Sequence, residues 1–333
     1  MARLRRVSAA APGWTRRRAG KGFTFWDQDG RRLSGRDVER IKSLVIPPAW
    51  QEVWICPVDN GHLQAVGTDE AGRRQYLYHP VWREQRDRKK FTRVTEVAAK
   101  LPAARRTVTR DLGIEGMPRE RVAAIAVRLL DLGYFRIGND VYTDQHGSFG
   151  LTTLEKRHVR KDRDRLMFTF TGKSGIEHSI EIDDADVIDA LDVLRRRRGG
   201  GDKLLAFRDE RRWSDLDAVH VNRYLDDLIG GDLTAKDFRT WHATVLAAAA
   251  LAMSDEPGDT KASRTRAVRE AVKEVAEYLG NTPTIARNSY IDPRVIDRYE
   301  EGVTIRDVAE RAHRSPARRQ SDLETAVRKL LEA

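Results

Sequence analysis

The segment LMFTFTGKSGIEHSIEI, residues 166–182, carries the strongest β-strand signal in the C-terminal two-thirds of the chain. Apolar residues lead into a turn flanked by Gly172 and Gly175, and three isoleucines lead out of it. Two short alternating runs around such a turn predict a β-hairpin with Lys173 at its tip. Because the sequence on both sides of this hairpin has a helical period, we expect a small sheet inside a mainly helical lobe.

The helical period is clearest between Val122 and Leu130, where apolar residues recur at the spacing of one helix face. Such patterns predict helices at residues 36–43, 121–132, 185–197, 215–228, 239–253, 264–279 and 322–332. Residues 22–90 mostly show short strand and turn signals, including a hairpin that would pair Phe23–Trp26 with Arg32-Leu33 across Gly30. The expected fold class is α+β, with a small β-rich N-terminal lobe and a mainly α-helical domain that contains a small sheet.

Composition divides the chain into three segments. Residues 1–21 carry seven basic and no acidic residues, which predicts a flexible leader, with a nucleic-acid-binding arm as the alternative. Residues 22–90 are assigned to the β-rich domain and residues 91–333 to the helical domain. The densely charged residues 82–92 are expected to form the hinge between these two domains.

The overall composition indicates the class of partner and the compartment. There are 61 basic and 51 acidic residues, a net charge of +10, which indicates a polyanionic partner. The single cysteine, Cys56, excludes an internal disulfide and a cluster of thiolate metal ligands. No segment approaches the ~20 apolar residues that cross a bilayer, and the N-terminus lacks the apolar core of a signal peptide. We therefore expect a cytoplasmic protein without a membrane partner.

Gly172-Lys173-Ser174 matches a nucleotide phosphate loop only in part. That loop requires a glycine five residues before Gly172 and a helix after the lysine. Met167 occupies the glycine position, and a strand is expected after the turn. No nucleotide cofactor is therefore predicted. Lys173 is either a solvated turn residue or a tip that reaches a ligand docked across the domain.

Two arginines lie in contexts that are unusual for a solvated surface. Arg136 follows the 121–132 helix among aromatic and small residues, and Arg239 is expected to begin the 239–253 helix, whose amide end favours an anion. A guanidinium fork can contact two phosphate oxygens at once. The alternative for each arginine is a structural ion pair, which for Arg239 would involve Asp237.

Tyr290 lies in polar and basic sequence, after Arg287 and before Pro293. A free phenol has a pKa of about 10, so a nucleophilic tyrosine needs cations that favour the phenolate. Two arginines and a lysine would supply that charge. A phosphotyrosine ester would also keep the energy of the broken phosphodiester, so that resealing would need no external energy source.

Taken in their order along the chain, these contexts resemble the small poxvirus-type and bacterial type IB DNA topoisomerases over about residues 22–300. The matching strings are Pro47-Pro48-Ala49-Trp50, Val53-Trp54-Ile55, Gly72-Arg73-Arg74-Gln75-Tyr76, Phe135-Arg136-Ile137-Gly138, Phe170-Thr171-Gly172-Lys173, Lys236-Asp237-Phe238-Arg239-Thr240-Trp241 and Gly280-Asn281-Thr282-Pro283 through Tyr290. Each string is short, but their common order argues against chance. The resemblance implies the catalytic fold that type IB topoisomerases share with tyrosine recombinases.

The resemblance implies a monomer that closes as a clamp around duplex DNA in the nucleoid and needs neither metal nor ATP. Tyr290 would attack one strand, leaving a 3′-phosphotyrosyl link and a 5′-hydroxyl that rotates and attacks back. By the same resemblance, Lys173 would protonate the departing 5′-oxygen together with Arg136. The non-bridging phosphate oxygens would be stabilised by Arg136, Arg239 and Asn281. DNA contacts are implied for Gln75, Tyr76, Tyr78 and Lys236.

Asn281 departs from the commonest pattern of that family. Many relatives carry histidine nine residues before the tyrosine. An amide can donate a hydrogen bond to a phosphate oxygen, but it cannot carry a protonic charge. The difference therefore affects the expected rate more than the expected reaction.

Two other functions are compatible with parts of the sequence. A site-specific tyrosine recombinase uses a similar fold and nucleophile, but usually places histidine three residues before the second arginine, where this chain has Lys236. A non-catalytic basic DNA-binding protein would account for the charge. It would not account for five catalytic-type contexts in one chain.

Overall fold

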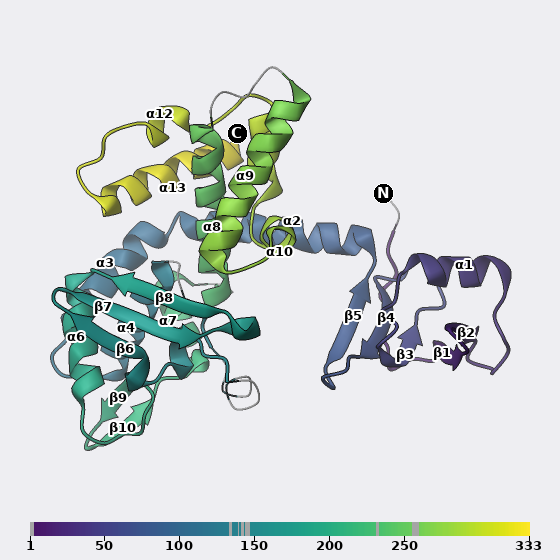
Figure 1. Ribbon diagram of the computed structural model, residues 1–333, viewed down its shortest axis with the longest axis horizontal. Helices are drawn as coiled ribbons and strands as arrows, with labels where there is room; N and C mark the ends of the chain where they lie inside the picture. The colour runs from purple at the N-terminus through teal and green to yellow at the C-terminus, as the bar shows by residue number, and fades with distance from the viewer. Residues whose placement is uncertain are drawn as a thin grey trace. The chain divides into compact units, whose positions relative to one another are not determined.

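The computed structural model describes residues 3–132, 135–138, 140, 143, 147–230, 233–254 and 260–333. The chain forms two compact units, Met1–Phe91 and Thr92–Ala333, which are called here the N-terminal unit and the helical unit (Figure 1). The α+β class expected from the sequence is confirmed, because the first unit is built on an antiparallel sheet and the second is mainly helical. Among the described helices, none is both long and apolar enough to span a membrane.

The N-terminal unit contains a five-stranded antiparallel sheet in the order β2-β1-β3-β4-β5. Its elements are β1 Trp14–Ala19, β2 Gly22–Trp26, α1 Gly35–Ser43, β3 Gln51–Ile55, β4 Leu63–Thr68 and β5 Arg74–Tyr78. Ile41 from the helix packs with Phe25, Val53, Ile55 and Ala65 from the strands to form a small apolar core. This core holds the sheet, and it leaves one face of the edge strand β5 in solvent.

Strand β1 corrects the prediction of a flexible leader over residues 1–21. Residues 14–19 pair with β2 along one side and with β3 along the other. The guanidinium of Arg16 donates hydrogen bonds to the carbonyl oxygens of Pro47 and Trp50, at 2.7 and 2.6 Å, and lies 4.1 Å from the centre of the Phe23 ring. Arginine stems and aromatic faces thus replace the aliphatic alternation of an ordinary strand.

The predicted hairpin between Phe23–Trp26 and Arg32-Leu33 is present as a short pairing around its turn, where Gly30 has φ +76° and the Leu33 amide donates to the Phe25 oxygen at 2.9 Å. The structure pairs β2 with β1, and only Trp26 and Arg32 form a bridge across the Gly30 turn. The longer pairing of β2 is with β1, a strand that the sequence analysis did not predict.

Helix α2, Pro80–Ala98, takes the place of the hinge that was predicted over residues 82–92. The division between the two units falls between Phe91 and Thr92, inside this helix. Its charged residues are largely exposed, whereas Phe91 and Val94 are buried. The charge run is therefore the solvated face of a helix, and one helical turn pairs Glu84 with Arg88 at 3.2 Å.

The helical unit places α4 and α8 in its interior. Every residue of α4 from Val122 to Val127 is buried, and so is most of α8. The helices are α3 Leu101–Leu112, α4 Arg119–Asp131, α6 Ala185–Arg196, α7 Ala218–Ile229, α8 Ala235–Met253, α9 Lys261–Leu279, α10 Pro283–Ser289, α11 Pro293–Glu300, α12 Arg306–Ala309 and α13 Pro316–Glu332. The helices expected from the apolar period are confirmed, with ends that move by up to six residues.

The hairpin predicted around Lys173 is confirmed as β7 Arg165–Thr171 and β8 Glu177–Ile182. Phe170 lies opposite His178 in the register, and the turn at Lys173–Gly175 joins the strands. A third strand, β6 Val159–Asp162, pairs with β7, and a separate hairpin is formed by β9 Ala206–Asp209 and β10 Arg212–Asp215. Figure 1 shows the β7–β8 turn at the end of the sheet nearest to the lower end of α9.

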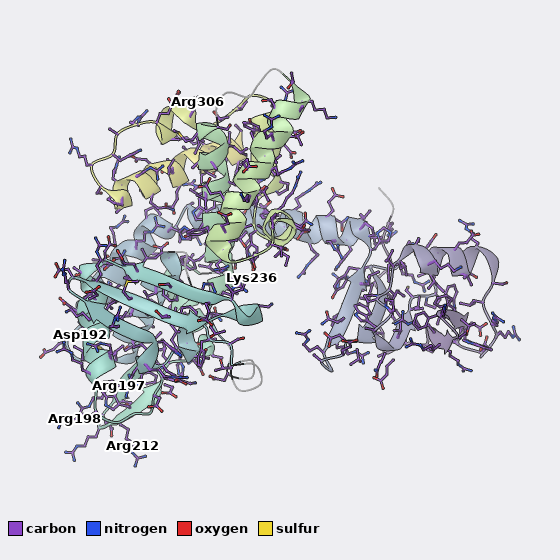
Figure 2. The ribbon with its side chains drawn as sticks, viewed as in Figure 1. Asp192, Arg197, Arg198, Arg212, Lys236 and Arg306 are labelled. Atoms are coloured by element: carbon purple, nitrogen blue, oxygen red, sulfur yellow. The ribbon has the colours of Figure 1, made fainter. Side chains whose placement is uncertain are left out.

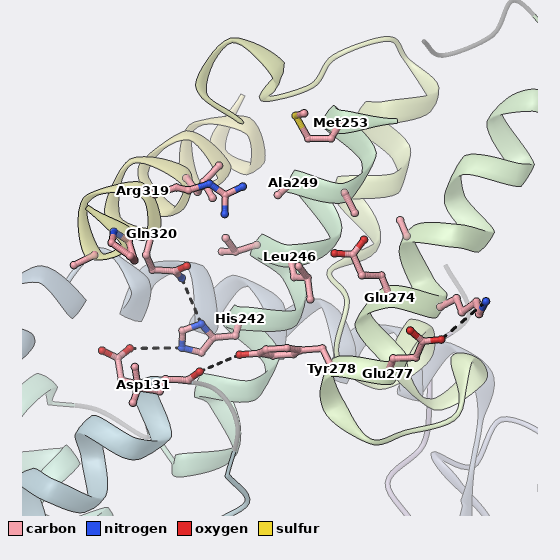
Figure 3. A pocket seen from close by; sticks show the side chains of 18 of the residues that line it. Asp131, His242, Leu246, Ala249, Met253, Glu274, Glu277, Tyr278, Arg319 and Gln320 are labelled. Atoms are coloured by element: carbon pink, nitrogen blue, oxygen red, sulfur yellow. Dashed lines mark hydrogen bonds and ion pairs between the residues drawn. The ribbon is translucent and has the colours of Figure 1, made fainter. Parts of the chain in front are cut away.

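A buried ionic network connects four helices of the helical unit. Arg105 of α3 donates to Asp131 of α4 and to Glu324 of α13, in both cases at 2.7 Å. His242 of α8 lies between Asp131 and Gln320 (Figure 3). The network lines an open cavity of about 1280 Å³ between α4, α8, α9 and α13. This cavity is lined by none of the five residues that the sequence analysis assigned to catalysis.

Candidate active site

The candidate site is built on the turn where α9 ends and α10 begins. Gly280 ends α9 in the left-handed region, at φ +58°, a conformation that glycine adopts without a side-chain clash. Thr282 then caps α10 by accepting a hydrogen bond from the Ile285 amide, and Pro283 occupies the first helical position. This turn directs the carbonyl oxygens of Leu279 and Gly280 toward two arginines.

Arg136 reaches this turn from the segment that follows α4. Its Nη2 donates to the carbonyl oxygens of Leu279 and Gly280, at 3.3 and 3.2 Å, and to Oδ1 of Asn281 at 2.9 Å. Burial lowers the pKa of Arg136, and a negative charge on Tyr290 would oppose that shift. All three of these acceptors are neutral carbonyl or amide oxygens. The contacts of Arg136 thus differ from the structural ion pair that was the alternative considered from the sequence.

Arg239 reaches the same carbonyl from α8. Its Nη2 donates to the oxygen of Leu279 at 2.6 Å, its guanidinium carbon lies 5.7 Å from the centre of the Tyr290 ring, and its side chain is buried. Burial lowers the pKa of Arg239, and the positive charge of Arg136 lowers it further. Two guanidiniums are thus held near one another in an environment that would favour an added anion.

The position of Arg239 within its helix corrects the prediction that it begins the helix. Helix α8 begins four residues earlier, at Ala235, and Thr234 and Asp237 form its N-terminal cap. Asp237 pairs with Arg93 at 2.8 Å, so the alternative of an Arg239–Asp237 ion pair is not what the structure shows. Arg239 therefore lies inside α8, away from the N-terminal end of the helix dipole.

Two hydrogen-bond donors in this site lack a partner among the described residues. They are Nε of Arg239 and Nδ2 of Asn281, and both atoms are buried. Buried donors in folded proteins are nearly always paired, because an unpaired donor costs ~1–3 kcal/mol. One of these donors belongs to the guanidinium of Arg239 and the other to the amide of Asn281, and both could donate to an anion such as a phosphate group.

Tyr290 forms the C-terminal cap of α10, and α8 fixes its backbone. Its amide donates to the Ala286 oxygen at 3.0 Å, and its carbonyl accepts from the hydroxyl of Thr244 at 3.2 Å. The Asp292 amide donates to the same hydroxyl at 3.1 Å. The ring is half-buried and packs against the apolar core, which the polar sequence around it did not indicate.

Lys173 is the member of the predicted set that the structure does not bring into contact with the others. Its side chain is exposed at the β7–β8 turn. Within the described ranges, no hydrogen bond or ion pair joins it to Arg136, Arg239, Asn281 or Tyr290. The structure thus assembles four of the five predicted residues and leaves the lysine at the rim.

His178 of β8 is a member of this neighbourhood that the sequence analysis missed. Its ring stacks on Phe170 at 5.1 Å between centres, and burial together with the charges of Arg136 and Arg239 lowers its pKa. The signal was present in the alternation of β8, where His178 shares the inward register with the buried Ile180 and Ile182. A polar residue on the same inward-facing side of a strand as buried apolar residues is a candidate for a functional site.

The residues implied in DNA contact lie on two different surfaces. Tyr76 and Tyr78 lie on the exposed face of β5, with 50% and 37% of their surfaces accessible, and their rings stack at 6.2 Å. Gln75 alternates to the other face and donates to Asp69 at 2.9 Å. Lys236 is exposed in the first turn of α8 (Figure 2). Tyr76, Tyr78 and Lys236 are thus accessible to a ligand, whereas Gln75 has an intramolecular partner.

Two protein families match this sequence. The family described as "Eukaryotic DNA topoisomerase I, catalytic core" matches residues 79–315, and "Bacterial DNA topoisomerase IB, N-terminal domain" matches residues 22–69. The first of these matches covers more than half of the chain and contains all five predicted catalytic positions.

Individual relatives agree with the family matches. DNA topoisomerase 1B of Acanthamoeba polyphaga mimivirus is 29% identical over 86% of this chain and 88% of its own length. DNA topoisomerase 1B of vaccinia virus is 19% identical over 71% of this chain and 72% of its own length. DNA topoisomerase 1 beta of Arabidopsis thaliana is 25% identical over 61% of this chain, which corresponds to only 21% of that much longer protein.

Among solved structures, the XerH site-specific recombinase bound to difH has a TM-score of 0.38 and 15% identity, and the likeness covers 62% of this chain and 52% of that one. This overlap is too limited to bear on fold or function. The family match over residues 79–315 decides between the functions considered from the sequence. The chain belongs to the type IB DNA topoisomerases, and it is an enzyme that acts on DNA.

Proposed function

We propose that this protein relaxes supercoiled duplex DNA by transient cleavage of one strand, with Tyr290 as the nucleophile. The phenol oxygen forms a bond to phosphorus, and the bond from phosphorus to the 5′-oxygen breaks. The products are a 3′-phosphotyrosyl link and a free 5′-hydroxyl. The free end rotates about the intact strand, attacks the phosphotyrosine and restores the phosphodiester.

The observation that carries this proposal is the convergence of Arg136, Arg239 and Asn281 beside Tyr290. Charge on the non-bridging oxygens must be stabilised during phosphoryl transfer, and fixed donors in a partly buried site do this without reorganisation. The unpartnered Nε of Arg239 and Nδ2 of Asn281 supply two such donors. The guanidinium of Arg239, 5.7 Å from the phenol ring, favours the developing phenolate.

Asn281 supports the proposal although many relatives carry histidine at its position. Its Oδ1 accepts from Arg136, which leaves the amide nitrogen oriented as a donor. In the proposed reaction this nitrogen donates to a non-bridging oxygen. The hydrogen bond survives the exchange of imidazole for amide, while the possible positive charge does not.

Lys173 is proposed as the general acid that gives its proton to the departing 5′-oxygen, with Arg136 nearby. An alkoxide is a poor leaving group, so protonation in the transition state accelerates cleavage by ~10²–10⁴-fold. The exposed position of Lys173 at the hairpin turn allows its four-carbon stem to reach a bound DNA strand.

The proposed reaction needs neither ATP nor a metal ion. The phosphotyrosyl ester stores the energy of the cleaved phosphodiester, so religation is close to isoenergetic. The two guanidiniums and the ammonium supply the positive charge that a metal ion supplies in other phosphoryl-transfer enzymes.

We further propose that the protein acts as a monomeric clamp on duplex DNA. Tyr76 and Tyr78 on the N-terminal unit and Lys236 on the helical unit are accessible and chemically suited to bases and phosphates. Gln75 joins them only if its hydrogen bond to Asp69 is exchanged for one to DNA. Binding that depends on phosphate contacts weakens as the salt concentration rises.

The test is a relaxation assay with supercoiled plasmid in EDTA and without ATP, across a range of salt concentrations. Wild-type protein is expected to relax the plasmid and to form a covalent adduct that denaturant traps. Tyr290→Phe should bind DNA with the same salt dependence and form no adduct. Adduct formation by Tyr290→Phe, or retention of all supercoils by the wild type at every salt concentration, would refute the proposal.

A further inference from the structure

The imidazole of His178 lies between the hairpin that carries Lys173 and the turn that carries Asn281. A methyl group added to Gly172 would meet Nε2 and Cδ2 of His178 at 2.5 Å, and one added to Gly280 would meet Cε1 at 3.1 Å. The ring is therefore in close contact with the backbone on both sides. On its face it stacks on Phe170.

We infer that His178 is a positioning residue for Lys173, which fixes the β7–β8 turn against the end of α9. This inference rests on the proposed function, in which Lys173 is the general acid. Gly172 directly precedes Lys173, and Gly280 directly precedes Asn281. The His178 side chain contacts both glycines. It thus connects the backbone next to Lys173, the proposed acid, with the backbone next to Asn281.

Lys173 depends on such a coupling because its own side chain has no hydrogen bond or ion pair within the described part of the chain. The position of its ammonium is set by the backbone of the turn, where the Gly172 amide donates to the Ile176 oxygen at 2.7 Å. That bond closes the turn, but it does not connect the turn to α9. The contact of His178 with Gly280 makes this connection.

The electrostatic surroundings argue against His178 as the acid itself. Burial lowers its pKa, and the charges of Arg136 and Arg239 lower it further, while Glu177 opposes the shift. This lowered pKa favours the neutral ring, which adds no third cation to the two guanidiniums. A flat, neutral ring can contact two glycine backbones at once, whereas a protonated ring would be repelled by the arginines.

A substrate with a better leaving group separates positioning of the acid from other roles. A duplex cleavage site is first mapped with the wild-type protein, and sulfur then replaces the 5′-bridging oxygen at that site. A thiol has a pKa several units below that of an alcohol, so its thiolate departs without protonation. Variants that have lost only acid catalysis cleave the sulfur substrate at the wild-type rate for that substrate.

Single-turnover cleavage is measured on both substrates for the wild type, His178→Ala, Lys173→Ala and Arg239→Ala. We expect His178→Ala to slow cleavage of ordinary DNA by roughly 10²-fold, the cost of a misplaced catalytic group. On the sulfur substrate the same variant should come within about threefold of the wild type, as should Lys173→Ala. Arg239→Ala should be slow on both substrates. As a matched control, His158→Ala removes a half-buried histidine in edge-to-face contact with Phe149 and should leave both rates unchanged.

Gly172→Ala provides a second, independent perturbation of the same contact. The backbone of Gly172 is at φ −93°, which alanine can adopt, so the new methyl group acts through the His178 ring. This variant should show the same loss on ordinary DNA and the same recovery with sulfur. In the His178→Ala background the ring is gone, so the added Gly172→Ala change should have little further effect.

The outcomes distinguish this inference from the proposed function. If sulfur restores Lys173→Ala but not His178→Ala, or if His178→Ala cleaves ordinary DNA at the wild-type rate, His178 does not position the acid. If sulfur fails to restore Lys173→Ala, the assignment of the acid is wrong and the inference falls with it. Thermal unfolding of each variant shows whether slow cleavage of both substrates reflects a damaged fold. If His178→Ala is misfolded, the rates of Gly172→Ala on the two substrates show whether the contact with His178 positions the acid.

Discussion

The guanidinium carbon of Arg239 lies 5.7 Å from the centre of the Tyr290 ring, while its Nη2 donates to the Leu279 carbonyl at 2.6 Å. One buried arginine thus touches both the residue proposed as nucleophile and the helix end that precedes Asn281. The arginine is held by a neutral carbonyl, which leaves its charge uncompensated and its Nε without a partner among the described residues. An arriving phosphate would complete its coordination.

Arg239→Ala and Arg239→Lys should both impair cleavage. Loss of one fixed donor to the transition state typically costs ~10²–10³-fold in rate. Lysine should restore little, because its three donors all lie on one nitrogen and cannot reproduce the planar fork of a guanidinium. Rapid-quench measurement of adduct formation checks this. Arg198→Ala, an exposed arginine near the β9–β10 hairpin, is the control (Figure 2). Equal rates for Arg239→Lys and the wild type would contradict the bidentate role.

Substitutions at Asn281 test whether the amide acts as a hydrogen-bond donor. Asn281→Ala removes Nδ2 and should slow adduct formation by about 10²-fold, the cost of one lost donor. Asn281→Asp has the same shape but places a negative charge beside the phosphate, so it should be slower than Asn281→Ala. Asn281→His restores a donor and should retain activity. A rate for Asn281→Asp equal to that of the wild type would show that the amide N–H is not used.

Thr244→Val should disturb the backbone on both sides of the Tyr290–Asp292 segment. The hydroxyl of Thr244 shares its proton between the oxygens of Thr240 and Tyr290, at 2.8 and 3.2 Å, and accepts from the Asp292 amide. Valine preserves the shape of the side chain but none of these bonds. We expect a loss of ~1–3 kcal/mol in the free energy of unfolding together with slower cleavage. Urea denaturation and single-turnover rates measure the two effects. Thr265→Val, an exposed helical threonine that bonds to Lys261, should change neither quantity.

Removal of Arg105 should destabilise the helical unit strongly. Its guanidinium is shared by two buried carboxylates, Asp131 and Glu324, and Arg105→Ala would leave both without their main partner. Breaking a buried ion pair typically costs ~3–5 kcal/mol. Denaturant unfolding measures the loss. The double variant Arg105→Met/Glu324→Leu should recover part of it, because it removes one of the stranded charges. A change below about 1 kcal/mol for Arg105→Ala would contradict a stabilising network.

The same network predicts how stability depends on pH. Burial alone would raise the pKa of Asp131, but hydrogen bonds from Arg105 and His242 and their positive charges hold it well below its usual range. The folded state therefore stays ionised where an unfolded aspartate, with a pKa of about 3.9, is protonated. This contribution is fully present above about pH 5 and is lost as the pH falls below 4 toward the folded-state value. The difference in unfolding free energy between wild type and Asp131→Asn should shrink over that acidic range.

The hairpin around Lys173 and the main helices of the helical unit were predictable because local alternation and the apolar period specify them. Strand β1 was not predictable from an apolar pattern, because the guanidinium of Arg16 holds it through the Phe23 ring and the backbone oxygens of Pro47 and Trp50. Helix α2 was read as a hinge for a similar reason. Its dense charges conceal the few buried residues, such as Phe91 and Val94, that hold it.

The candidate site was predictable in its chemistry but only partly in its geometry. The residues at positions 136, 239 and 290 were identified from local context and Asn281 from the family resemblance, and the fold brings the four together. Arg239 was placed at a helix terminus because the capping residues Thr234 and Asp237 were not recognised. His178 was missed because its contacts with Gly172 and Gly280 join segments more than 100 residues apart, which no local pattern records.

Helix α8 carries both Arg239, which faces the phenol ring, and Thr244, which holds the phenol's backbone. The five-residue interval corresponds to about 7.5 Å along the helix axis, at 1.5 Å per residue. Inserting or deleting a single residue within that interval would turn one group by about 100° away from the other. The segment between positions 239 and 244 should therefore tolerate no change in length, because one rigid helix sets the spacing between the cation and the residue proposed as nucleophile.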